Sequence, residues 1–311
     1  MTPDAALVLA AGLGTRLDPL TRLVAKPAVP LGRLTLIERV LEWTRRQGVR
    51  EVVLNLHHLP ASLTGLVGDG AHLGLRVRYS WEQPVLGSAG GPRHALPLVT
   101  GDPVLIVNGD TLAEFDLAPM LEAHVQSGAD VTLAVVPNPA PDHYNGMTLD
   151  ESSRVTGFVP RGRAQDSWHF IGVQFAGRRV FDGLVDGVPA ETIAGIYRDV
   201  VAAGGGRIRA WRATTRFIDV GTLRDYLHAA LAFDGDPRVG ITRSVIWPEA
   251  RLAADVTLDQ CIVAGPVRLP SGFRARDAVI VPAAVARDGD ASSTVDDIAV
   301  FPIAPYNGSR G

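Results

Sequence analysis

Short apolar runs alternate with segments of helical periodicity over roughly the first half of the chain, and this alternation most strongly limits the possible folds. Five runs are typical of buried strands, at residues 5–10, 51–56, 75–80, 103–110 and 130–136. Helical patterns begin near residue 35 and occupy residues 88–96 and 117–128. Strands and helices that alternate every ~25–30 residues are typical of α/β folds. The pattern therefore predicts a doubly wound, mostly parallel α/β sheet.

The pattern of apolar residues and predicted elements changes twice further along the chain. Residues 146–220 mix short strands with one helix near 192–203, and we interpret them as the far half of the sheet plus a substrate-facing lobe, closed by a helix at 222–233. Beyond residue 235, apolar residues recur at the six-residue spacing of hexapeptide β-helices in two runs separated by a break near Pro266. The first run is Ile246, Leu252 and Leu258, and the second is Val267, Phe273, Val279 and Val285. We predict a main α/β domain at 1–235, a short left-handed β-helix-like segment of two or three coils at 236–290, and a tail at 291–311. An irregular strand-rich tail is the alternative.

Composition narrows the class of protein. Of the 311 residues 46% are hydrophobic and 20% charged, which favours a packed core over disorder. The formal charge of −3 argues against a general nucleic-acid binder but leaves room for a small anionic ligand. The one cysteine, Cys261, which we expect to be buried in a coil, cannot form an intrachain disulfide, so we expect a reducing, cytoplasmic location. No positive region precedes the first apolar run, and no run is long enough for a membrane span, so we expect neither a signal peptide nor a membrane association.

A glycine-rich loop follows the first predicted strand in the stretch "LVLAAGLGTRLDPLTRLVAKPAVP", residues 7–30. The dinucleotide fingerprint G-x-G-x-x-G fails here because Leu17 takes the place of the third glycine, and no lysine follows at phosphate-loop spacing. Gly12 and Gly14 would let successive backbone N–H groups turn toward an anion. Arg16 adds a planar fork suited to a polyphosphate.

Lys26, in the same stretch, is the only lysine among the 30 cationic Lys and Arg residues of the chain. A compact ammonium group can follow one oxygen of a reacting phosphate, whereas a guanidinium favours a fixed bidentate pair. The position therefore favours a role at a reacting phosphate. Chance placement is the alternative.

The segment "GLGTRLDPLTRLVAKPAVP" resembles the signature G-x-G-T-R-[LM]-x-P-L-T-x(4–5)-K-P-x-x-P of the sugar-1-phosphate nucleotidylyltransferases, and the resemblance extends to about residue 233. In that family the loop wraps a nucleoside triphosphate, its arginine holds the departing pyrophosphate, and its lysine meets the phosphate at the reacting centre. The resemblance implies a Rossmann-like nucleotidyltransferase fold and catalytic roles for Arg16 and Lys26. It also implies nucleotide binding by the segment's first part, namely Leu9, Ala10, Ala11, Gly12, Gly14 and Thr15.

Two aspartates lie where a metal ion would be held. Asp110 ends the fourth predicted strand in "VNGD", and Asp219 lies in "FIDVGT", where Phe217 replaces the tryptophan of the family pattern. Ligands of an α/β sheet bind at the carboxyl ends of its strands, and Mg²⁺ takes one or two carboxylates plus substrate phosphates. The resemblance implies Mg²⁺ binding by both aspartates. Roles in turns or helix caps are the alternative.

Base, ribose and sugar contacts are also implied by the resemblance. The stretch "EQPVLGSAGGPRHAL" is similar to the family's E-x-P-L-G-T-A-G segment, which implies that the base and ribose lie near Leu86, Gly87, Ser88 and Gly90, with Asn108 and Gly109 beside the ribose. Relatives carry E-K-P where this chain reads "RVTGFVPRGR", so their sugar-binding carboxylate and lysine are absent. Arg161 is the candidate replacement for the cation, and Gly146 and Gly172 are candidate backbone contacts to the sugar.

These observations predict an Mg²⁺-dependent transfer of a nucleoside monophosphate from a nucleoside triphosphate to a sugar 1-phosphate. The missing Glu-Lys pair keeps open a non-catalytic regulatory subunit or nucleotide-sugar sensor on the same fold. An acylating β-helix is disfavoured because no histidine follows His228. The nucleotide is not decided by the sequence, since the chain resembles both mannose-1-phosphate guanylyltransferase-like and N-acetylmuramate-1-phosphate uridylyltransferase-like proteins. We also expect copies of the chain to associate through the C-terminal segment.

Overall fold

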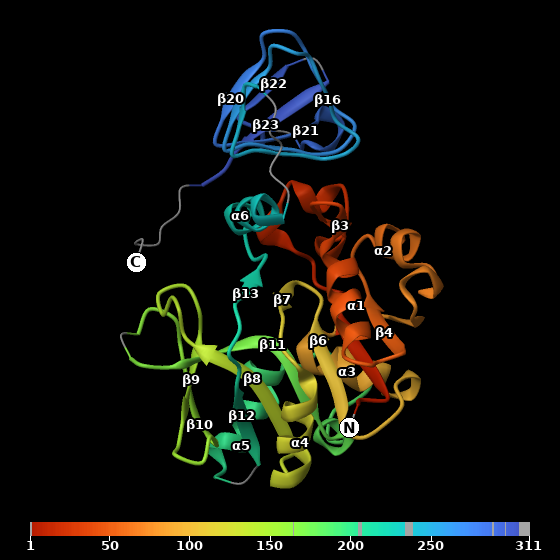
Figure 1. Ribbon diagram of the computed structural model, residues 1–311, viewed down its shortest axis with the longest axis vertical. Coiled ribbons are helices and arrows are strands. Elements are labelled where there is room, and N and C mark those ends of the chain that lie inside the picture. The colour runs from red at the N-terminus through yellow and green to blue at the C-terminus, as the bar shows by residue number, and fades with distance from the viewer. Residues whose placement is uncertain are drawn as a thin grey trace. The chain divides into compact units, whose positions relative to one another are not determined.

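The computed structural model describes residues 2–163, 165–204, 207–233, 239–287, 289–295 and 297–304. The chain divides into two compact units (Figure 1). Unit 1 is built from the described residues of Met1–Gly12 and Glu38–Ile218, and unit 2 from those of Leu13–Ile37 and Asp219–Asn307. The predicted boundary between residues 235 and 236, and residues 305–311 of the predicted tail, lie outside the described residues. The predicted three-part division stays a prediction.

Unit 1 is organised by a nine-stranded mixed sheet whose parallel part surrounds the first strand, as the alternation predicts. The order is β10-β9-β11-β6-β1-β4-β5, with β8 and β12 joined through β11. Strands β4 and β6 each pair in parallel with β1, and β5 pairs in parallel with β4. Strand β12 pairs in parallel with β8. The antiparallel strand β11 joins the two parallel parts. The nine strands are β1 (Ala5–Leu9), β4 (Glu51–Leu56), β5 (Arg76–Trp81), β6 (Val104–Asn108), β8 (Val131–Pro137), β9 (Gly146–Leu149), β10 (Val155–Val159), β11 (Trp168–Ala176) and β12 (Ile208–Arg212). A separate two-stranded sheet is formed by β7 (Thr111–Ala113) and β13 (Phe217–Asp219).

Burial on both faces explains the unbroken apolar run of β1. Ala6, Leu7 and Val8 each have 0% exposure, so successive side chains on opposite faces are all covered. Leu7, Ile106 and Leu133 belong to one apolar core. The helices are α1 (Leu36–Arg46), α2 (Pro60–Val67), α3 (Gly87–Ala95), α4 (Leu117–Ser127), α5 (Tyr197–Ala202) and α6 (Leu223–Phe233), of which α6 belongs to unit 2. No helix in the described residues is both long enough and apolar enough to cross a bilayer.

Unit 2 contains a stack of short parallel strands that wind into coils (Figure 1). Each paired residue lies 17 positions after its partner, as in Ile241 with Leu258 and Ile262 with Val279. Leu252 and Leu258 pack in the coil interior at the predicted six-residue spacing. The strands are β2 (Pro30–Leu31), β3 (Leu34–Thr35), β14 (Ile241–Thr242), β15 (Val245–Ile246), β16 (Arg251–Leu252), β17 (Thr257–Asp259), β18 (Ile262–Val263), β19 (Arg268–Leu269), β20 (Arg274–Arg276), β21 (Ala278–Pro282), β22 (Ser293–Val295) and β23 (Ile298–Pro302).

The end of the coils is closed by a hairpin. Strands β22 and β23 pair with each other, and β23 runs antiparallel to β21. Part of the predicted tail is therefore ordered sheet that covers the last coil. Cys261 is fully buried in the coils, and burial raises the pKa of its thiol to about 11, as expected for a structural cysteine.

Candidate functional site

The ends of β1 and β6 and the middle of the neighbouring β11 bring together four predicted ligand-binding residues in unit 1. Leu9 of β1 is in register with Asn108 of β6, and the Gly109 N–H donates to the Leu9 carbonyl at 2.9 Å. Gly172 lies in β11 beside them, where the pairing of β11 with β8 changes register. A Cβ at Gly172 would lie 2.9 Å from the Cβ of Asn108. Glycine is therefore required at this position by the close approach of β11 to Asn108 at the end of β6.

A buried polar chain connects the loop after β1 with the start of α3. The Ala10 N–H donates to Oδ1 of Asn55 at 2.6 Å, and the Asn55 Nδ2 donates to Oε1 of Glu82 at 2.7 Å. The other carboxylate oxygen of Glu82 accepts the Leu86 N–H at 2.7 Å. Asn55 and Glu82 are 3% and 5% exposed, so their polar atoms depend on these protein partners. The predicted nucleotide-binding residues Ala10 and Leu86 are thus held by two side chains that the sequence analysis did not select.

The first turn of α3 is bonded to a loop that the sequence analysis left out. The Ser88 Oγ donates to Glu191 at 2.5 Å, and the Ala89 and Gly90 N–H groups donate to the Ala190 carbonyl at 2.9 and 3.1 Å. A Cβ at Gly87 would approach Glu191 Oε1 to 2.6 Å. The glycines of this segment therefore have a structural reason, the close approach of the loop at 188–191. The contact of the segment with base and ribose stays a prediction.

The signature segment lies in unit 2 from Leu13 onward and folds into three short 3₁₀ turns, at Thr15–Leu17, Leu20–Arg22 and Lys26–Ala28. Gly14 has a φ of 63°, and its carbonyl accepts the Leu17 N–H at 2.9 Å. Lys26 is 7% exposed and packs its Cβ against Gly14, whereas Thr15 and Arg16 are exposed.

Arg16 and Asp219 converge in unit 2 at the turn before α6. A Cβ added at Gly221 would lie 2.9 Å from Oδ2 of Asp219. It would lie 3.3 Å from both Nη1 of Arg16 and Oδ2 of Asp225. Thr222 caps the helix, because its Oγ1 donates to Asp225 at 2.8 Å and accepts the Asp225 N–H at 3.2 Å. The turn thus places a cation predicted to bind pyrophosphate beside two carboxylates, one of which the sequence analysis missed.

The donor chemistry at this turn suits a hard divalent cation. Asp219 and Asp225 offer carboxylate oxygens, which Mg²⁺ prefers, and Mg²⁺ commonly uses only one or two of them together with substrate phosphates. Within the described ranges, no three His, Cys, Asp or Glu side chains form a cluster fit for a metal. Asp110 belongs to unit 1, where Oδ1 accepts the Thr111 hydroxyl at 3.3 Å.

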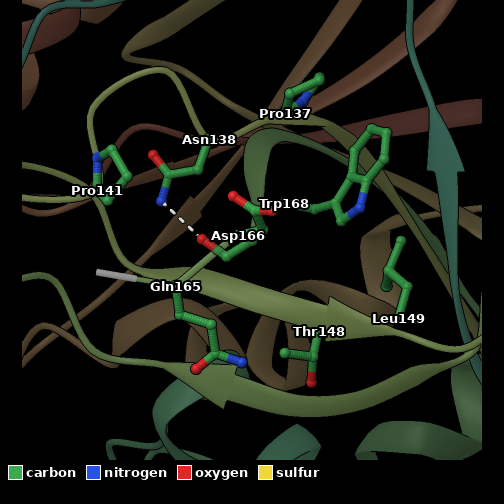
Figure 2. Close-up of a pocket in the computed structure, with 9 residues that line it drawn as sticks. Pro137, Asn138, Pro141, Thr148, Leu149, Gln165, Asp166 and Trp168 are labelled. Atoms are coloured by element: carbon green, nitrogen blue, oxygen red, sulfur yellow. Dashed lines mark hydrogen bonds between the residues drawn. The ribbon is translucent and has the colours of Figure 1, made fainter. Parts of the chain in front are cut away.

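A pocket of about 360 Å³ opens in unit 1 beside the predicted sugar contact Gly146 (Figure 2). A Cβ at Gly146 would collide with Ser167, which lines the pocket. Asn138 is fixed there by bonds from its Nδ2 to Ser167 Oγ and to the Tyr144 carbonyl, both 3.2 Å. Figure 2 shows side chains from β8, β9 and the approach to β11 around the space. The lining consists of Pro137, Asn138, Pro141, Thr148, Leu149, Gln165, Asp166, Ser167 and Trp168.

Arg161, the predicted replacement for the family lysine, does not line this pocket. Its side chain is exposed, and its backbone N–H donates to Asn145 Oδ1 at 3.0 Å. The pocket instead holds a carboxylate, Asp166, and a ring, Trp168, whose face is covered by the Arg212 guanidinium at 4.8 Å. The phosphate-binding role of Arg161 stays a prediction.

Phe217, which replaces the family tryptophan, belongs to an aromatic cluster. Its ring centroid lies 5.2 Å from that of His169 and 5.6 Å from that of Tyr144. The His169 Nδ1–H donates to the Asn145 carbonyl at 3.0 Å, and burial lowers the pKa of the ring. The phenyl ring therefore packs on the imidazole that holds the Asn145 carbonyl, next to Gly146.

Comparisons with known proteins identify relatives of this chain. Residues 5–234 match the family described as nucleotidyl transferase. The chain is 30% identical over 226 residues to a mannose-1-phosphate guanylyltransferase of Mycobacterium tuberculosis, which covers 72% of this chain but only 63% of that protein. It is 32% identical over 225 residues to an N-acetylmuramate alpha-1-phosphate uridylyltransferase of Neisseria meningitidis serogroup B. This match covers 70% of this chain and 93% of that protein.

A solved structure supports the fold of the matched region. The crystal structure of HddC from Yersinia pseudotuberculosis superposes with a TM-score of 0.65 at 22% identity. The match covers 74% of this chain and 100% of that one. The shared fold accounts for most of the chain, and the expected α/β architecture is confirmed.

Proposed function

We propose, from the premise that this chain belongs to the nucleotidyl transferase family, that it transfers a nucleoside monophosphate from a nucleoside triphosphate to a sugar 1-phosphate. The products are a nucleoside diphosphate sugar and pyrophosphate. Relatives at 30% and 32% identity bear the names of enzymes with this kind of reaction. The observation that carries the proposal is the packing of the chain's only lysine, Lys26, against Gly14 of the signature segment.

The proposed reaction requires the protein mainly to position the two substrates and to neutralise the charge on their phosphates. An oxygen of the sugar 1-phosphate attacks the α-phosphorus in line, and the bond from that phosphorus to the pyrophosphate oxygen breaks. The attacking oxygen is already anionic, so the protein need not remove a proton. Lys26 stabilises charge at the reacting phosphate, and Arg16 holds the departing pyrophosphate with its fork. The strand-end residues Leu9, Asn108 and Gly109 provide a fixed platform for the nucleoside.

Mg²⁺ is the cofactor that the proposed reaction calls for. When bound, it would neutralise phosphate oxygens as charge shifts to the leaving group. Asp219, with Asp225 beside it, supplies carboxylates of the right chemistry in unit 2, and Asp110 is the predicted ligand in unit 1.

The pocket beside Gly146 is the proposed place of the sugar ring. Side-chain amides, hydroxyls and a carboxylate suit sugar hydroxyls, and the indole of Trp168 offers an apolar face. Asp166 would take the place of the carboxylate that relatives carry in E-K-P. Asp166→Asn should raise the KM for the sugar phosphate and leave the KM for the nucleotide unchanged. Asp182→Asn, an exposed carboxylate outside this pocket, is the matched control.

Pyrophosphate release tests the proposed function directly. The purified full chain is incubated with Mg²⁺, each of GTP, UTP, dTTP, ATP and CTP, and a panel of sugar 1-phosphates. Release that depends on one nucleotide and one sugar phosphate would establish the reaction and identify both substrates. No release from folded protein that still binds a nucleotide would contradict it and favour a regulatory role. Sedimentation of the same sample tests the further proposal that copies associate through the C-terminal segment.

A further inference from the structure

Residues 13–30 of the signature segment and the C-terminal coils belong to the same compact unit, although more than 200 residues separate them in the sequence. Arg22 is the centre of their contact. It is the second residue after the "P-L" of the signature and falls between Arg16 and Lys26. Its side chain is only 12% exposed, so its charge must be balanced within the protein.

Every arm of the Arg22 guanidinium has a partner. Nε donates to Oδ1 of Asp18 at 2.7 Å, and Nη2 is paired with the other oxygen of the same carboxylate. Nη1 reaches into the C-terminal segment, where it donates to the Val285 carbonyl at 3.0 Å and pairs with Oδ2 of Asp290 at 2.5 Å. The ring of Phe301 lies 5.5 Å from the guanidinium carbon. One side chain thus joins the signature segment to the last coil and to the closing hairpin.

The rest of the signature segment is fixed to the same coils. A Cβ at Gly265 would lie 3.3 Å from Leu23, so this turn of the coils touches the residue after Arg22. At the end of the segment, the Tyr226 hydroxyl donates to the Pro30 carbonyl at 2.8 Å and accepts the Trp247 Nε1–H at 2.8 Å. The coils are therefore anchored at both ends of the stretch that contains Lys26.

Helix α6, which begins just after the turn at Asp219, is anchored in the same way. Arg224, with an 11% exposed side chain, donates to Oδ1 of Asp277 and to Oε1 of Gln260 at 3.3 and 3.1 Å. It also reaches the carbonyl of Ala304 at 3.1 Å. Both the signature segment and the start of α6 therefore depend on residues of the C-terminal segment.

We infer that the C-terminal coils support the catalytic segment from outside it, and that Arg22 is a positioning residue through which Asp290 and Val285 hold the signature segment in its folded form. The inference rests on the proposed function for its effect on turnover. Small displacements of groups that align a phosphate cost large factors in rate, so a loosened segment lowers kcat more than it raises KM. The coils thereby act as a clamp on the segment that contains Arg16 and Lys26.

Asp290→Asn tests the clamp without altering the signature segment itself. Asp290 has a 29% exposed side chain, so the variant is expected to fold. Amide hydrogen exchange across residues 14–28 should become faster by about 10-fold, because local opening is easier once one anchor is removed. Turnover should fall by about 10-fold with little change in either KM. Arg22→Lys, which keeps the charge but loses the fork, should show both effects.

The matched control is Arg243→Gln, which removes an ion pair with Asp259 in the coils that does not involve the signature segment. Its amide hydrogen exchange at residues 14–28 and its turnover should both equal those of the wild type. Unchanged exchange at residues 14–28 in both Asp290→Asn and Arg22→Lys would overturn the clamp, as would faster exchange with unchanged turnover. Faster exchange in the two variants, together with no transferase activity in the wild type, would instead uphold the anchoring and contradict the proposed function.

Discussion

Gly14 and Lys26 pack so closely that no side chain fits between them: a Cβ at Gly14 would lie 2.9 Å from the Cβ of Lys26 and 2.8 Å from Cγ2 of Thr21. The φ of 63° at Gly14 is also one that residues with a Cβ rarely adopt. The first glycine-rich turn and the lysine therefore form a single packed structure. The signature's glycine and lysine are linked by geometry as well as by their proposed chemistry.

Gly14→Ala should destabilise the protein and lower its activity together. The left-handed backbone alone costs a residue with a Cβ about 1–2 kcal/mol, and the contacts with Lys26 and Thr21 add to this. We expect the free energy of unfolding in urea to fall by at least about 2 kcal/mol. A variant as stable as the wild type would contradict the described packing.

Gly12→Ala tests whether glycine is needed at this position of the loop for the folded structure or for ligand binding. A Cβ at Gly12 meets no atom within 4 Å, and no positive φ is involved. Its stability should therefore remain within about 0.5 kcal/mol of wild type. If the backbone approaches the nucleotide here as proposed, the KM for the nucleotide should rise. Unchanged kinetics would remove Gly12 from the predicted nucleotide site.

Lys26→Ala should lower kcat by about 100- to 1000-fold, the usual cost of removing one preorganised charge at a reacting centre. Lys26→Arg should recover little of this loss, because the planar guanidinium cannot follow one oxygen as closely. Arg33→Ala, an exposed cation seven positions further on, is the control and should retain wild-type turnover. Near-normal turnover in Lys26→Ala would refute the proposed mechanism.

The sequence predicted the elements that depend on local periodicity. The fully buried run of β1 and the six-residue spacing of Leu252 and Leu258 are confirmed, since each pattern follows from which side chains face a core. Helix α2 was missed because its eight residues have weak amphipathic patterning and include Gly65. The coil repeat of 17 residues also could not be read from a six-residue spacing alone.

Contacts between residues far apart along the chain could not be predicted from the sequence. Asn55 and Glu82 are 27 positions apart, and the Asn55 side chain could have been noticed only as a polar residue within a buried strand. The contact of Arg22 with Val285 spans 263 positions and has no local signal. Such pairs arise from the tertiary fold, so the site's supporting side chains appear only when the strands and coils are assembled.

Tyr226→Phe should weaken unit 2 through two buried hydrogen bonds. The hydroxyl joins Trp247 to the Pro30 carbonyl, and burial raises the pKa of the phenol well above its usual value. Removing it leaves both partners unsatisfied, at a cost of about 1–3 kcal/mol. Tyr79→Phe removes an exposed hydrogen bond to the Gly68 carbonyl and should cost less. Equal losses of stability in the two variants would argue against the buried arrangement.

Acid should destabilise unit 1 through His124. This ring is 5% exposed, lies 2.8 Å from the Thr132 hydroxyl through Nδ1, and has its pKa lowered by burial, which Asp102 and Asp130 only partly offset. The unfolded chain takes up a proton near the ordinary pKa of about 6.5, while the folded ring stays neutral to lower pH. The stability that the neutral ring contributes is therefore present above that pH and is lost as the pH falls below it. The slope is at most about 1.4 kcal/mol per pH unit for one proton.

Urea unfolding between pH 7.5 and 5 measures this effect. The free energy of unfolding should fall with acid in the wild type, and less steeply in His124→Gln, which keeps a polar side chain but cannot be protonated. His72→Gln is the control, because His72 lies outside the buried positions and should leave the slope unchanged. The same slope in His124→Gln as in the wild type would place the acid sensitivity elsewhere, and His169, whose pKa is also lowered by burial, would be the next ring to test.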